Sequence, residues 1–113
     1  ETDFFFELYQ GTGYIRVYDD TDIQDMGMTN DIYDIPYAPL NGWNPNKEEI
    51  AQIGHTYVIW TYDNHFAKIR VKNITSDRIV FDWAFQLVEG EPQLKPVVKG
   101  SGERTLNKLQ LAR

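Results

Sequence analysis

Four aspartates stand close together near the start of this sequence, at Asp19, Asp20, Asp22 and Asp25. Carboxylate oxygens are the ligands that Ca²⁺ prefers in proteins. The segment is no EF-hand, because the glycine and the closing glutamate are missing from the required positions. The spacing therefore favours a solvated acidic loop held by Asx-turns, with a calcium site formed by the four aspartates as the alternative.

The two histidines, His55 and His65, could each bind a haem iron, alone or together with another chain. His55 opens a predicted strand, and His65 lies at a predicted hairpin tip beyond the far end of that strand. A straight segment between them would hold the two residues up to ~33 Å apart, at ~3.3 Å per residue. We therefore do not expect them to share one metal ion, and two polar turn histidines are the alternative.

Three large rings with polar tips, Tyr33, Tyr37 and Trp43, lie in one segment stiffened by Pro36 and Pro39. They follow neither strand nor helix periodicity, so they are not assigned to a core face. Rigid aromatic side chains of this kind suit a ligand platform on which a sugar, a peptide or a haem could stack. The alternative is that the rings cover an open edge of the sheet.

The sequence offers little to nucleophilic or acid–base catalysis. It has no cysteine, and Ser76 and Ser101 fall in predicted turns without the context of a nucleophile elbow. Asp82 has the most apolar setting among the acids, but a cross-strand ion pair with Arg70 would account for it. We therefore expect the protein not to be an enzyme.

Composition limits the class of protein further. With 113 residues, 42% of them hydrophobic and 14% aromatic, the chain should form a single domain with a real core. A net charge of −6 argues against a nucleic-acid partner or an anionic membrane surface. No apolar run approaches the ~20 residues of a membrane span, so no membrane insertion is expected. Because the sequence begins at Glu1, we expect a mature protein or an excised domain.

The segment from Gly54 to Gln86 organises the predicted fold. Three runs of β-forming residues, free of glycine and proline, predict a meander of three antiparallel strands. A two-residue loop at Asp63-Asn64 would pair Trp60 with Ala67. A three-residue loop at 75–77 would pair Ile69 with Trp83 and Arg70 with Asp82. The residues expected to be buried together are Trp60, Ile69, Val71, Phe81 and Trp83.

The remaining elements complete an all-β prediction. Residues 3–9 and 14–18 are predicted to form a hairpin around a turn at 10–13. Lys47 to Ile53 is predicted to form a short helix, which Asn44 caps and Gly54 ends. We expect a mostly antiparallel sandwich or open barrel of six to eight strands, with that one helix.

The meander also carries a family resemblance. Residues 56–71 read Thr-Tyr-Val-Ile-Trp-Thr-Tyr-Asp-Asn-His-Phe-Ala-Lys-Ile-Arg-Val, and residues 80–86 read Val-Phe-Asp-Trp-Ala-Phe-Gln. Together they resemble the HmuY-like family, in which a similar hairpin precedes an aromatic-rich strand. The resemblance implies an all-β bacterial domain that is exported, at the cell surface, in the periplasm or secreted, and often lipid-anchored. The name-giving member of that family is a haem-binding haemophore.

We therefore expect a non-enzymatic, exported bacterial binding or accessory domain that resembles HmuY-like proteins. One alternative is a haem carrier of the same family, and another is a carbohydrate-binding module attached to a larger enzyme. The expected partner is a small ligand, a glycan or a neighbouring protein domain. Calcium and haem are the two candidate cofactors.

Overall fold

Eight β-strands and one 3-10 turn account for the regular structure of the described residues. The computed structural model describes residues 4–75, 78–94 and 97–105. No helix within these ranges is long and apolar enough to cross a membrane. The elements are β1 (Phe4–Tyr9), β2 (Thr12–Val17), β3 (Asp22–Met28), η1 (Ile32–Asp34), β4 (Glu48–Ile50), β5 (His55–Trp60), β6 (Phe66–Ile74), β7 (Arg78–Gln86) and β8 (Val97–Thr105).

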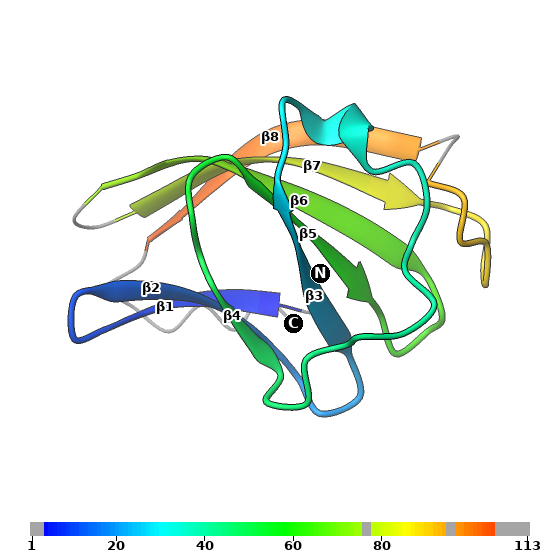
Figure 1. Ribbon diagram of the computed structural model, residues 1–113, viewed down its shortest axis with the longest axis horizontal. Coiled ribbons are helices and arrows are strands. Elements are labelled where there is room, and N and C mark those ends of the chain that lie inside the picture. Colours follow the sequence, from blue (N-terminus) through cyan, green and yellow to red (C-terminus); the bar gives the residue numbers. More distant parts are fainter. Residues whose placement is uncertain (1–3, 76–77, 95–96, 106–113) are drawn as a thin grey trace.

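The strands form two antiparallel sheets, which confirms the predicted all-β class (Figure 1). One sheet has the order β1-β2-β4, and the other has the order β3-β5-β6-β7-β8. A single buried cluster draws residues from both sheets, so the main core lies between them as in a sandwich. Its members are Phe6, Ile15, Val17, Ile23, Ala51, Tyr57, Ile59, Ile69, Val71, Ile79 and Phe81.

The first hairpin was predicted, but its turn is two residues shorter than the predicted turn at 10–13. β1 and β2 pair so that Tyr9 lies opposite Thr12, which leaves a loop of Gln10 and Gly11. Both loop residues have positive φ, at 49° and 82°. Two-residue loops of this kind match the twist of the strands that they join, and glycine adopts positive φ without steric cost.

The pairing of β6 with β7 was also predicted correctly. Ile69 lies opposite Trp83, and Arg70 lies opposite Asp82. The register shifts by one residue after Val71, so a bulge supplies the extra residue that the prediction placed in the loop. Residues 76 and 77 of that loop lie outside the described ranges.

The ion pair predicted across β6 and β7 has a different cation. Lys72 Nζ lies 3.6 Å from the Asp82 carboxylate. Arg70 donates from Nε to the Thr29 hydroxyl at 3.0 Å and from Nη2 to the Thr29 carbonyl at 2.9 Å. Arg70 therefore ties the residue that follows β3 to the centre of the sheet.

The predicted pairing of β5 with β6 was wrong by one residue. Trp60 lies opposite Phe66, and Ile59 lies opposite Ala67. The connection is a loop of residues 61–65 closed by a bond from Thr61 N to the His65 carbonyl at 2.8 Å. Because strand side chains alternate, this shift moves Trp60 out of the main core. The other four residues predicted to be buried together do belong to that core, with Trp83 packed at its margin.

The register was misread because both faces of β5 are covered. A second buried cluster, made of Ala38, Val58, Phe66 and Leu94, lies on the opposite face of the longer sheet. The segment that follows β3 crosses this face (Figure 1). Lys68 is therefore buried, and its Nζ donates to the carbonyl of Ile35 at 2.9 Å.

The helix predicted over Lys47–Ile53 is wrong, because part of this segment forms the edge strand β4. Glu48 lies opposite Arg16 of β2, and backbone bonds of 3.0 and 2.9 Å flank the short ladder. A helix this short is marginal in water, so tertiary pairing decides its conformation. Gly54 does adopt the left-handed conformation of a C-cap glycine, with φ 89°, but it leads into β5.

Candidate functional site

A cleft of about 370 Å³ opens where β5 ends and β3 begins. The antiparallel pairing of these strands places Asp22, the first residue of β3, opposite Trp60, the last residue of β5. The loop before β3 and the hairpin loop after β5 therefore meet at one edge of the sheet. The cleft is lined by Asp20, Asp22, Trp60, Thr61, Tyr62 and Asn64.

Aromatic rings form the apolar part of this cleft. Trp60 and Tyr62 keep 36% and 53% of their surface exposed. Behind Trp60, the Phe66 ring is stacked on the indole at 5.5 Å and 16°, and Trp43 lies 5.8 Å away at 36°. These contacts fix the plane of the exposed indole.

Polar groups with defined orientation stand beside the indole. Trp60 Nε1 donates to Asn64 Oδ1 at 2.8 Å, and the Asn64 Nδ2 group is turned away from the indole, towards Gly90. Lys47 Nζ lies 2.8 Å from Asp22 Oδ1 and also donates to the Thr21 carbonyl at 3.0 Å. The cleft therefore combines an apolar ring surface with hydrogen-bonding groups at its rim.

The tip of the β5–β6 hairpin is held by side-chain hydrogen bonds. The Thr61 hydroxyl donates to the Asp63 carboxylate, and this bond, with a smaller contribution from nearby His65, lowers the pKa of Asp63 below its usual value. His65 lies 3.3 Å from Asp63 through Nδ1 and 3.2 Å from the Leu87 carbonyl through Nε2. Its ring stacks on Phe85 at 5.5 Å.

A pH dependence follows from the lowered pKa of Asp63. The ionised carboxylate stabilises the folded state above the ordinary aspartate pKa, and this contribution is lost as the pH falls through the lower folded pKa. We expect Asp63→Asn to cost under ~1 kcal/mol at neutral pH, since the side chain is half exposed. The melting temperature of the variant should fall less between about pH 6 and about pH 2 than that of the wild type. Parallel melting curves for the two proteins across that range would contradict this role.

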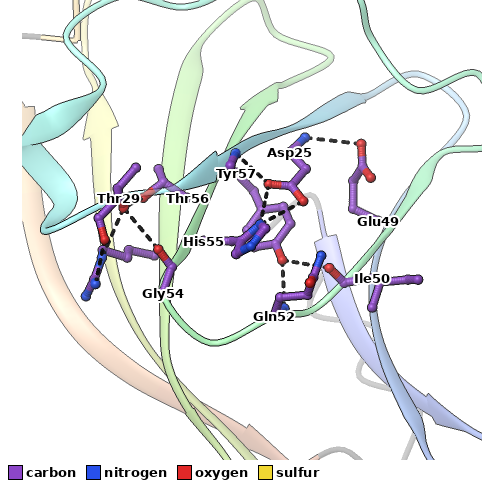
Figure 2. Close-up of polar contacts among 11 residues, drawn as sticks. Asp25, Thr29, Glu49, Ile50, Gln52, Gly54, His55, Thr56 and Tyr57 are labelled. Atoms are coloured by element: carbon purple, nitrogen blue, oxygen red, sulfur yellow. Dashed lines mark hydrogen bonds and ion pairs between the residues drawn. The ribbon is translucent and has the colours of Figure 1, made fainter.

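A second polar cluster lies where β3 and β5 approach β4 (Figure 2). His55 Nδ1 lies 3.0 Å from each oxygen of the Asp25 carboxylate. Asp25 also accepts from Gly27 N at 2.8 Å, and its own amide donates to Glu49 at 3.1 Å. The carboxylate thus orients the His55 imidazole and holds the irregular part of β3 between Asp25 and Met28.

Tyr57 occupies the centre of this cluster (Figure 2). Its hydroxyl donates to the Ile50 carbonyl at 2.6 Å and accepts from Gln52 N at 2.8 Å. Burial raises the pKa of the Tyr57 phenol well above its ordinary value, so the hydroxyl stays protonated. These bonds tie the end of β4 in one sheet to β5 in the other.

The structure does not gather the four predicted calcium ligands. Asp22 is paired with Lys47 and Asp25 with His55, whereas Asp19 and Asp20 are exposed. Within residues 4–75, 78–94 and 97–105, no group of three or more acidic, histidine or cysteine side chains could hold a metal ion. Acids that are close in sequence are separated here because β3 directs their side chains to different neighbours.

The other predicted site residues fall in three places. Tyr33 lies in η1 and Tyr37 forms an isolated bridge with Gln93, and both rings are exposed. Trp43 contacts Trp60 and Phe66 instead of standing alone on its loop. The two candidate haem ligands lie at the start of β5 and just before β6, and each has an aspartate beside its Nδ1.

Sequence reasoning missed Trp60, Tyr62 and Asn64 as candidate site residues. Trp60 was assigned to the core, and Asn64 was read only as a turn former. The signal that could have found them is the density of aromatic and amide side chains where β5 runs into its hairpin loop. That signal becomes specific only when β3 brings Asp20 and Asp22 alongside.

Comparisons of the chain with protein-family models, curated proteins and solved structures found no match. The resemblance to HmuY-like proteins therefore stays a prediction from the sequence.

Proposed function

We propose that this chain is a non-enzymatic binding domain that holds a small ligand in the cleft at the end of β5. The observation that carries the proposal is an exposed tryptophan, fixed in plane by two further rings and flanked by carboxylate and amide groups, beside a hollow of about 370 Å³. Hollows that combine aromatic rings with a few oriented polar groups are typical of small-molecule sites.

Binding is favoured over catalysis because the polar groups with catalytic potential serve as structural links. Asp25 and His55 form the arrangement closest to a catalytic pair, but Asp25 also holds the register shift within β3 through Gly27. The Tyr57 ring stacks on His55, and its hydroxyl forms hydrogen bonds with two backbone groups. These interactions hold β3, β4 and β5 together, as a rigid scaffold for a binding site requires.

The proposed setting is an exported bacterial protein, and the support for it is the HmuY-like hairpin sequence. A haem carrier of that kind would use His55 or His65. The aspartate beside each Nδ1 and the stacking of His65 on Phe85 support structural roles for both, so we place the ligand at Trp60. We expect haemin added to the protein to keep the Soret band that it has in buffer alone, without the shift that histidine ligation would cause.

A ligand screen with four variants tests the proposal. The indole N–H signal of Trp60, identified by its loss in Trp60→Phe, would be followed in a nitrogen-15 spectrum while a chemically varied set of small molecules is added. We expect at least one compound to shift this signal saturably, and Tyr62→Ala to weaken its binding at least tenfold, ~1.4 kcal/mol.

Two exposed tyrosines outside the cleft provide controls for this screen. Tyr9→Ala, on the β1–β2 hairpin, should leave the affinity unchanged. Loss of binding in Tyr37→Ala alone would move the site to the segment first predicted from the sequence. A screen in which no compound shifts Trp60 would overturn the proposed function.

A further inference from the structure

The residues of the cleft also indicate which class of ligand it takes. We infer that the cleft binds the pyranose ring of a carbohydrate. This inference rests on the proposed function, because it concerns the same cleft. It is carried by two features of the site, the flat exposed indole of Trp60 and the paired polar groups at its rim.

The indole suits the apolar side of a sugar. A pyranose presents several C–H groups on one face and its hydroxyl groups around the rim. C–H groups pack favourably on the electron-rich face of an aromatic ring. Because Phe66 and Trp43 already fix the plane of Trp60, little side-chain freedom is lost when a ring settles on it.

The polar groups suit the hydroxyls of the same ring. A hydroxyl both donates and accepts, so a pair of neighbouring hydroxyls is best met by one donor and one acceptor. Asn64 Oδ1 accepts from Trp60, and its Nδ2, which lies beside Gly90 of the loop after β7, donates to no residue in the described ranges. Asp22 Oδ1 is held by Lys47, and Oδ2 accepts from no described residue. The rim therefore offers a donor and an acceptor on the two loops that border the indole.

Size and openness set the expected affinity. A volume of about 370 Å³ lies near the lower end of small-molecule sites, so the cleft holds one ring better than several. The exposed surface of Trp60 and Tyr62 shows that the ligand would be only partly enclosed. We expect a dissociation constant on the order of 1 mM for a single sugar ring.

A quaternary ammonium ligand is the rival class, since aromatic rings and carboxylates also attract cations. Lys47 argues against it, because its ammonium lies 2.8 Å from Asp22 and offsets that charge. The Asn64 amide argues against it too, because an N–H donor repels a cation but bonds a hydroxyl.

The test follows the Trp60 indole signal during titration with methyl glycosides of glucose, galactose and mannose, with N-acetylglucosamine and with tetramethylammonium chloride. We expect a saturable shift with at least one sugar. Asn64→Asp keeps the acceptor for Trp60 Nε1 and removes the donor, so it should weaken sugar binding at least tenfold. The same variant adds a negative charge and would tighten the binding of a cation. Tyr9→Ala should bind sugar as the wild type does.

The outcomes separate this inference from the proposed function. A Trp60 shift with tetramethylammonium or with other compounds, but with no sugar, overturns the carbohydrate assignment and leaves the cleft as a binding site. No shift with any compound in either screen overturns both. Trisaccharides of the sugar that binds distinguish its source: tighter binding than the methyl glycoside indicates a glycan chain, and equal binding indicates a single free ring.

Discussion

Replacing Ile59 with alanine is expected to lower the free energy of unfolding by about 2–5 kcal/mol. The side chain is 1% exposed and belongs to the core between the two sheets. It lies opposite Ile23 on β3 and Ala67 on β6, so truncation leaves a cavity that three strands surround. Urea denaturation would measure the change, provided that the variant and the wild type have the same m-value.

Ile53→Ala is the matched control for this substitution. It removes the same atoms from a side chain that is 52% exposed, in the turn before β5. We expect a cost below about 1 kcal/mol, because most of the deleted surface already faces water. Equal costs at the two positions would show that the Tyr57–Ile59 face of β5 does not point into the core.

Replacing Tyr57 with alanine is expected to cost about 3–5 kcal/mol, as for other large buried aromatic residues. The ring is fully buried between the sheets, and its hydroxyl bonds both Ile50 and Gln52. Truncation therefore removes core volume and the link between β4 and β5 at once.

Tyr57→Phe separates these two effects. It keeps the ring and removes only the hydroxyl, so it should cost ~1–2 kcal/mol for two backbone groups that lose a partner. Hydrogen exchange at the Gln52 amide should accelerate more than exchange in β6 or β7, because only the first loses its bond. Unchanged protection of Gln52 would contradict the role of this hydroxyl as a link between the sheets.

Local features of the sequence determined the parts of the fold in which neighbouring residues decide the outcome. The first hairpin was predicted from the turn residues at 10–13, although only Gln10 and Gly11, both with positive φ, form its loop. The pairing of Ile69 with Trp83 followed from matching apolar alternation in β6 and β7. The conformation of Gly54 was predicted as well, although the helix before it does not exist.

The tertiary structure decided whatever depends on a distant segment. Residues 48–50 form a strand because they pair with the edge of β2. The local residues that predicted a helix carry no information about this distant partner. The four aspartates near residue 20 were separated because Lys47 and His55 reach two of them from other segments of the chain.

The candidate site shows the same division between local and distant information. Sequence alternation assigned Trp60 to the core because it assumes one buried and one exposed face. Thr56, Tyr57, Val58 and Ile59 are all buried, since the segment after β3 covers the second face of β5. Burial on both faces removes the alternation that fixes a strand register, so only the assembled sheet could place Trp60 at the cleft.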